Sequence, residues 1–178
     1  MNDVLKTIFS RAGVKEYTSE VPGDETLTLL MEAGAAAPNA FNRQAWYFTA
    51  VTSPEILTRI DQETVRCLRK NGRAKDPAYR PLYGAPALII LSSVTDNEFA
   101  RQDCSCASEN IALAAVSLGL AARYLDVPNL AFRADGGLRA LCRIPEGYQT
   151  VCFLSLGYPK DPAYRPTPKN PGGIAIVH

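Results

Sequence analysis

A run of side-chain amides lies in a short loop between a helical segment and a strand. Asn39, Asn42 and Gln44 follow Pro38 and precede the aromatic residues 46–48. An amide offers both hydrogen-bond donors and acceptors, which is the mixture that the edge of a flat heteroaromatic ring with carbonyls and ring nitrogens requires. Pro and Asn are also common in ordinary turns for backbone reasons. The loop alone therefore leaves two interpretations open, a ring-binding loop and a polar turn.

A second polar pattern lies near the N-terminus. Arg11 and Lys15 flank Gly13, where the backbone can turn freely. Two cations beside a flexible turn suit a phosphate group, because charge-assisted hydrogen bonds to phosphate are strong. A solvated basic surface has the same composition, so this pattern also leaves two interpretations open.

Several kinds of catalytic machinery are excluded by residue type. The one histidine is His178, so a triad that needs an internal histidine is not available. The cysteines, Cys67, Cys104, Cys106, Cys142 and Cys152, include no CxxC pair, and no zinc pattern results. We therefore predict no metal and no catalytic side chain, and we expect any enzymatic chemistry to come from a cofactor.

The bulk composition is that of an ordinary globular domain. The chain has 178 residues, 47% of them hydrophobic, and a formal net charge of +1. A charge so close to zero favours neither nucleic acid nor an acidic membrane surface, so an anion site must be local. The first residues lack the apolar core of a secretory signal, and no apolar run approaches the roughly 20 residues of a membrane span. We expect one cytoplasmic domain with reduced thiols.

Periodicity and turn residues predict the elements that must position these groups. We expect a helix near residues 4–9, a helix capped by Asp24, a helix opened by Pro54, and a loop over 69–83 that is suited to a lid. The remaining predicted elements are a strand at 46–51, a buried strand at 87–94, a helix at 103–120, a strand or irregular segment at 121–127, a short helix at 137–142 and a buried strand at 151–156.

Other features are less directly tied to chemistry. Small residues at 33–37 allow a close approach of backbone to a helix or to a ligand, and the Pro-rich tail 160–178 is expected to lie on the domain or on a partner chain. Cys104 and Cys106 are predicted to face different sides of a helix and to act as small packing residues. The heptapeptide KDPAYRP occurs twice, at 75–81 and 160–166, without a wider period.

In order and spacing these pieces resemble the nitroreductase family of FMN-dependent oxidoreductases. The segment RAGVKEY at 11–17 is similar to the family's Arg-Arg-Ser-Val-Arg-x-Tyr, and APNAFNRQAW at 37–46 is similar to Ala-Pro-Ser-Ser-x-Asn-x-Gln-Pro-Trp. Further similarities are GAP at 84–86, ENI at 109–111, LGL at 118–120, IPEGY at 144–148 and LGYP at 156–159, followed by a basic position near Lys169. The resemblance covers nearly the whole chain.

The resemblance implies an α+β fold, with a mixed, mostly antiparallel sheet flanked by helices, in an intertwined homodimer. Residues 1–178 would form one FMN-binding domain with an extended arm from about 160. Two FMN molecules would sit at the dimer interface, with NADH or NADPH as a transient reductant. The implied cofactor residues are the phosphate-binding Arg11, Lys15 and Lys169, with Ala12 and Gly13 in the same loop; Pro38, Asn39, Ala40 and Asn42 along the ring from the partner chain, with Gln44 in support; and Tyr124, Leu125 and Asp126 near the ring's N5 edge.

Departures from the family pattern keep a second function open. Ala12 and Gly13 replace an arginine and a serine, and Asn39 and Ala40 replace two serines. The first hypothesis is an enzyme that passes hydride by a ping-pong route from NAD(P)H through flavin N5 to a nitroaromatic, quinone, enone or other electron-poor acceptor. The second hypothesis is a flavin-binding redox carrier or sensor without turnover, which the loss of a cation and a hydroxyl favours.

Overall fold

A four-stranded antiparallel sheet forms the centre of the molecule. The computed structural model describes residues 1–73, 76, 78–166, 168, 170 and 172–178. The strands are β1 (Trp46–Val51), β2 (Ala87–Val94), β3 (Ala121–Leu125) and β4 (Tyr148–Gly157), in the spatial order β1-β2-β4-β3. All three pairings are antiparallel. The expected α+β class is confirmed, and the predicted bounds of β1 and β2 are correct.

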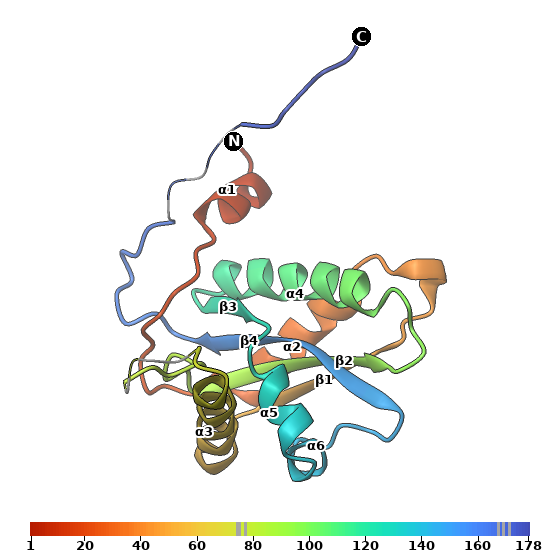
Figure 1. The fold of residues 1–178 in the computed structure, drawn as a ribbon. Helices are drawn as coiled ribbons and strands as arrows, with labels where there is room; N and C mark the ends of the chain where they lie inside the picture. The colour runs from red at the N-terminus through yellow and green to blue at the C-terminus, as the bar shows by residue number, and fades with distance from the viewer. Residues whose placement is uncertain (74–75, 77, 167, 169, 171) are drawn as a thin grey trace.

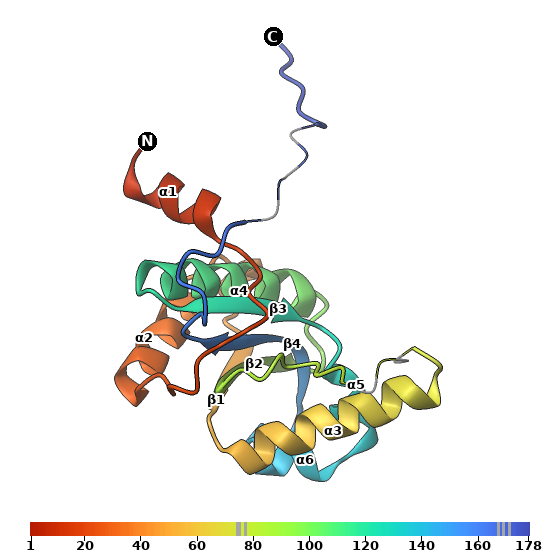
Figure 2. The ribbon, with the colours of Figure 1, turned by 90° about the vertical axis from the view of Figure 1, so that its left-hand side faces the viewer.

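Helices cover both faces of this sheet (Figure 1, Figure 2). On one face lie α2 (Asp24–Ala35) and α4 (Ala100–Ser117), and on the other lie α3 (Pro54–Lys70), α5 (Asn129–Ala134) and α6 (Gly137–Leu141). Alternation along a strand explains the two layers, because successive side chains point to opposite faces. In β2, Ile89 packs in the core under α4 while Leu88 and Ile90 pack in the core over α3, all three fully buried.

Several predicted boundaries were wrong. The N-cap of α2 is Gly23, so Asp24 is the first helical residue, where its charge still favours the positive end of the helix. Helix α3 extends to Lys70, into the segment predicted as loop, and α4 begins at Ala100 instead of 103 and ends at Ser117. Helix α5 was not predicted, because six residues are too short to display a helical period.

The small residues at the end of α2 serve helix packing. A Cβ placed on Gly34 would lie 2.8 Å from Cδ1 and Cγ1 of Ile111 in α4. Nδ2 of Asn110 in α4 also donates to the carbonyl of Ala33 at 3.1 Å. At Ala33 and Gly34 the structure shows the close approach to a helix, which is one of the two alternatives predicted for residues 33–37.

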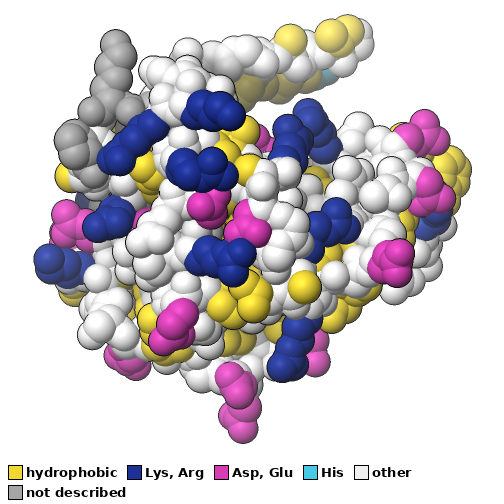
Figure 3. All heavy atoms as spheres, turned by 60° about the horizontal axis from the view of Figure 1, so that its bottom comes forward, with side chains coloured by type: hydrophobic (Ala, Val, Ile, Leu, Met, Phe, Trp, Pro, Cys, Tyr) yellow, Lys and Arg dark blue, Asp and Glu magenta, His cyan; other side chains and the backbone are white. Residues whose placement is uncertain are grey.

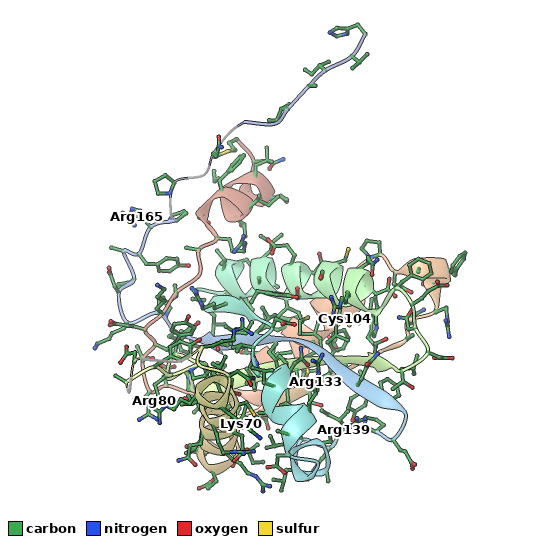
Figure 4. All side chains as sticks on the ribbon, viewed as in Figure 1. Lys70, Arg80, Cys104, Arg133, Arg139 and Arg165 are labelled. Atoms are coloured by element: carbon green, nitrogen blue, oxygen red, sulfur yellow. The ribbon has the colours of Figure 1, made fainter. Side chains whose placement is uncertain are left out.

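The two cysteines of α4 face different sides, as predicted. Cys104 is fully buried among the residues under α4 (Figure 4), whereas Cys106 is exposed. The packing role is therefore correct for Cys104 and wrong for Cys106, since two residues along a helix rotate the side chain to the opposite face.

Both ends of the chain leave the sheet on the same side (Figure 1). Helix α1 (Asp3–Ser10) has no buried residue. The arm after β4 runs beside the segment that follows α1, with a backbone bridge between Tyr17 and Pro159 and a hydrogen bond from Lys160 N to Glu16 O at 3.1 Å. Beyond these contacts the side chains of Ile174, Ile176 and Val177 are exposed. None of the described helices combines the length and the apolar character that a membrane span requires.

Candidate functional site

The loop after α1 lines a cavity together with the C-terminal arm. This cavity, called the N-terminal cavity here, has a volume of about 540 Å³. Its polar lining includes the cations Lys15, Lys160 and Arg165, and the arm carries Arg165 on the side of the molecule where the N-terminal segment runs (Figure 4). The full lining is Ala12, Gly13, Val14, Lys15, Glu16, Lys160, Asp161, Tyr164 and Arg165. Three of the predicted cofactor residues, Ala12, Gly13 and Lys15, therefore share one cavity with residues of the second KDPAYRP copy, to which the sequence assigned no function.

The described residues of the repeated heptapeptide make the same turn hydrogen bonds in both places. In the arm, Asp161 Oδ1 accepts from Ala163 N at 2.8 Å, and its carbonyl accepts from Tyr164 N at 3.2 Å. In the first copy, Asp76 accepts from Ala78 N at 2.8 Å and from Tyr79 N at 3.3 Å. An aspartate that bonds the backbone two residues on is a standard turn device. In the arm this turn brings Tyr164 and Arg165 to the N-terminal cavity.

Charges of both signs lie around the cavity. Glu16 Oε2 is 3.8 Å from Lys160 Nζ, a loose and exposed ion pair. The lining then carries three cations against the carboxylates of Glu16 and Asp161. On the opposite, lower side of the molecule basic and acidic side chains are interspersed (Figure 3). The positive excess at the cavity is thus local, as a net charge of +1 requires.

Arg11 is absent from the lining of the N-terminal cavity and pairs with a carboxylate. Its Nε lies 2.8 Å from Oε1 of Glu109 in α4, with the two side chains 31% and 52% exposed. Sequence reasoning placed Arg11 at a phosphate without anticipating this partner. The sequence marked Glu109 only as part of the ENI motif at 109–111. A motif of this kind does not reveal which side chain contacts Glu109 in the fold.

A further arginine reaches the same loop from β3. Nη1 of Arg123 donates to the carbonyl of Gly13 at 2.9 Å, and its guanidinium carbon lies 4.5 Å from the centroid of the Tyr83 ring. Tyr17 lies nearby. Burial raises the pKa of its hydroxyl well above the ordinary value, and the positive charge of Arg123 offsets only part of this rise. Sequence reasoning missed Arg123, although it stands next to the predicted ring-edge residue Tyr124.

The predicted ring-edge residues end the edge strand β3. Because β3 pairs only with β4, one side of its backbone has no ladder partner among the described strands. Tyr124 is 51% exposed and Leu125 is buried. Asp126 Oδ1 accepts from Asn129 Nδ2 at 3.1 Å, and its carbonyl accepts from Asn129 N. The strand thus presents backbone amides and one aromatic side chain at an open edge.

The amide loop (residues 38–44) is a largely exposed turn with an unusual backbone conformation. Phe41, Asn42 and Gln44 have positive φ values of 53°, 51° and 48°. Such values are uncommon for residues other than glycine and cluster at functional sites. Asn39 Oδ1 accepts from Gln44 N at 2.8 Å, and Ala40 N donates to Asp103 Oδ1 at 2.9 Å. Pro38, Asn42 and Gln44 are exposed, and Asn39 and Ala40 are half-buried.

One chain does not bring the two groups of predicted residues together. The amide loop is anchored at the first turn of α4 through Asp103, whereas residues 12–15 lie near the other end of that helix (Figure 1). A helix of this length spans about 27 Å. Lys169 lies outside the described residues, so its predicted role has no structural outcome. In the described part of the chain no cluster of His, Cys, Asp and Glu is arranged to hold a metal ion.

Comparisons with known proteins agree with this architecture. The chain is 31% identical over 166 residues to an Archaeoglobus fulgidus protein that is provisionally named an NADH dehydrogenase/NAD(P)H nitroreductase, covering 90% of this chain and 88% of that protein. Two solved structures that cover 100% of both chains are also similar. The nitroreductase with bound FMN from Desulfitobacterium hafniense has a TM-score of 0.89 and 30% identity. The nitroreductase with bound FMN from Bacteroides fragilis has a TM-score of 0.87 and 30% identity. Residues 8–158 match the Nitroreductase family, and the chain belongs to that family.

Proposed function

We propose that this protein is an FMN-dependent oxidoreductase, with the FMN phosphate in the N-terminal cavity and the ring along the edge of β3. The observation that carries the proposal is the N-terminal cavity itself, where Gly13 and Lys15 meet the cations Lys160 and Arg165 next to an open strand edge. Similarity to FMN-bound nitroreductases supports the choice of cofactor.

The lining residues fit a phosphorylated ligand in charge and in size. The volume of about 540 Å³ lies within the usual range for small-molecule sites. A phosphate monoester carries close to two negative charges, and a charge-assisted hydrogen bond to such a group contributes about 1.5–3 kcal/mol. Lys15, Lys160 and Arg165 provide donors of this kind. Arg11 and Lys169 are proposed as further phosphate ligands. Arg11 would then either break its ion pair with Glu109 or bind Glu109 and the phosphate at the same time.

We propose that a second copy of this chain completes the site. Val4, Leu5, Ile8 and Phe9 of α1 are between 42% and 66% exposed, an apolar surface that a helix normally buries. The apolar end of the arm is exposed on the same side of the molecule (Figure 1). A homodimer would cover both and would bring the partner's amide loop to the ring, so that residues 1–178 act as one domain with an exchanged arm from about 160.

The chemistry of such a site comes from the cofactor. When bound, FMN would accept hydride from NADH or NADPH and deliver it to a nitroaromatic, quinone, enone or similar acceptor. The order would be ping-pong, because both substrates need the same face of the ring. The chain's part is to bind the phosphate, to offer backbone amides of residues 124–126 to the ring edge, and to place Asn39 and Asn42 beside the ring. No internal histidine is needed for hydride transfer, and the sequence contains none. Five free thiols are compatible with the cytoplasm.

The purified protein tests this function in two steps. We expect absorption bands near ~370 and ~450 nm with about one FMN per chain after denaturation. We then expect steady oxidation of NADH or NADPH with a quinone, with parallel lines in double-reciprocal plots. A protein that neither carries nor takes up FMN would contradict the cofactor assignment. Bound FMN without turnover would favour the carrier or sensor function.

A further inference from the structure

The side chain of Arg123 joins strand β3, near the proposed ring position, to the phosphate loop at Gly13 within one chain. It stands on β3 immediately before Tyr124, and its Nη1 donates to the carbonyl of Gly13 at 2.9 Å. The segment near the ring and the loop near the phosphate are therefore connected by one guanidinium. Among the described residues, no other side-chain hydrogen bond joins β3 to residues 11–15.

The surroundings of Arg123 fix the position of its guanidinium. The Tyr83 ring lies under it, with 4.5 Å between the guanidinium carbon and the ring centroid, which is a favourable cation–π distance. Tyr83 itself has φ of +58° and packs edge-on against Tyr79, with ring centroids 6.5 Å apart. A residue in the left-handed region persists only where its surroundings hold it. The cation is thus held between a carbonyl and a fixed aromatic ring.

Gly13 has the residue type that this arginine requires. A Cβ built on Gly13 would lie 2.8 Å from Nη1 of Arg123, closer than real Cβ contacts allow. A side chain at position 13 would therefore require the guanidinium end of Arg123 to shift. The replacement of serine by glycine in the motif at 11–17 therefore matches the presence of arginine at position 123.

The charge of Arg123 is not neutralised by a carboxylate among the described residues. Its neighbours there are a carbonyl and an aromatic ring, both of which leave the full positive charge in place. Ala12, one residue before Gly13, stands where the family pattern has a cation. Arg123 brings a cation to the same stretch of backbone from a different element.

We propose that Arg123 is a positioning residue of the flavin site, which holds the Gly13 backbone against β3 and supplies the positive charge that Ala12 lacks. This inference rests on the proposed function. It predicts that Arg123 matters for the phosphate group of the cofactor and not for the ring.

The test compares FMN with riboflavin, which has the same ring and no phosphate. Apoprotein is titrated with each flavin, and the quenching of flavin fluorescence gives the Kd. We expect Arg123→Ala to raise the Kd for FMN by at least about tenfold, because the phosphate loop loses a nearby positive charge and the hydrogen bond that positions Gly13, and to change the Kd for riboflavin little. Arg123→Gln, which keeps donors without the charge, is the second variant if the alanine variant does not fold, and we expect the same phosphate-dependent loss. Arg133→Ala in α5, which removes one exposed cation elsewhere, is the matched control and should leave both values unchanged.

A double-mutant cycle tests the link to Gly13. Gly13→Ala is expected to raise the Kd for FMN in the wild-type background and to have little further effect in the Arg123→Ala background, because the colliding atom is then absent. Additive effects would overturn the claim that the glycine accommodates the arginine.

The outcomes also separate this inference from the proposed function. Wild-type protein that binds neither flavin would overturn the proposed function. Wild-type protein that binds FMN, with variants at Arg123 that bind it equally well or lose FMN and riboflavin to the same degree, would overturn the role of Arg123 alone.

Discussion

At the scale of single residues, the pairing of Arg11 with Glu109 sets how available the first predicted phosphate ligand is. The two side chains are 2.8 Å apart between Nε and Oε1 and are only half-buried. Ion pairs of this exposure contribute about 0.2–1 kcal/mol, so a dianionic phosphate can compete for the guanidinium. In the proposed site the Glu109 carboxylate would compete with the cofactor for Arg11.

Glu109→Gln is therefore expected to tighten FMN binding. The expected change is a two- to fivefold lower Kd, about what an exposed ion pair contributes, whereas Arg11→Ala should raise the Kd. Fluorescence titration of the apoprotein measures both. Glu146→Gln, an exposed carboxylate in the turn before β4, is the control for loss of one negative charge. A weaker FMN complex in Glu109→Gln would show that Glu109 orients Arg11 instead of competing for it.

Thiol reactivity is a second property that single residues decide. Cys104, Cys142 and Cys152 are buried, and burial raises the pKa of Cys142 to about 11 and that of Cys152 to about 12. For Cys104, burial raises the pKa of the thiol further still. At pH 8 the thiolate fraction of these groups is then on the order of one in a thousand or less.

We expect brief treatment of the folded protein with a thiol reagent at pH 8 to leave these three cysteines unmodified. Peptide mass mapping identifies the labelled positions, and the same treatment in denaturant should label all five cysteines. Rapid labelling of Cys104, Cys142 or Cys152 without denaturant would contradict their assigned burial.

At the scale of elements, the contact between α2 and α4 depends on a glycine. Gly34 is buried, and its missing side chain leaves the space that Ile111 fills. The same contact places Asn110 against the end of α2, from which the chain continues into the amide loop. The position of the loop relative to α4 thus follows from how closely the two helices approach.

Gly34→Ala is expected to destabilise the protein by about 1–3 kcal/mol through overpacking, partly offset by the better helix propensity of alanine. Thermal or denaturant unfolding measures the change. The same substitution in an Ile111→Ala background should cost much less, because the cavity accepts the added methyl group. Gly136→Ala is the control, since a Cβ at that position meets nothing within 4 Å. Equal effects of Gly34→Ala in both backgrounds would contradict the packing explanation.

At the scale of the whole molecule, the exposed apolar surface of α1 and the separation of the two halves of the site have one common explanation. A single chain places the amide loop and residues 12–15 at opposite ends of α4 (Figure 1). A two-fold symmetric pair of chains can place the amide loop of one chain beside the N-terminal cavity of the other. The proposed dimer would therefore complete the proposed site as well as cover the exposed surface.

Mixed dimers test whether the two halves come from different chains. Lys15→Glu reverses a charge in the N-terminal cavity. Ala40→Trp places a bulky side chain on the amide loop, in the space proposed for the flavin ring of the partner chain. We expect each variant alone to lack FMN, and we expect a mixed dimer of the two to carry one FMN per two chains, because one of its sites takes both intact halves. Differently tagged chains allow the mixed dimer to be isolated and its FMN to be counted. An empty mixed dimer, or a native mass equal to one chain, would contradict the shared site.

The sequence alone determined the strands β1 and β2, the family and the kinds of group at the proposed site. Local signals suffice for these. The apolar run ALIILSSV predicts a buried strand without knowledge of its neighbours, and the amides at 39–44 predict a polar loop. The bounds of α3 and α4 and the existence of α5 were not predictable in this way, because helix ends depend on tertiary contacts as well as on propensity.

Only the tertiary structure decided which residues surround the predicted ones. Arg123 and Gly13 are 110 positions apart, and Glu109 and Arg11 are almost as distant, yet each pair is in contact. Likewise the second copy of KDPAYRP lines the N-terminal cavity only because β4 ends beside the segment that follows α1. Residue type and spacing report what a side chain can do, whereas the contacts between distant segments are set by how the sheet and its helices pack, and these contacts decide what each side chain meets.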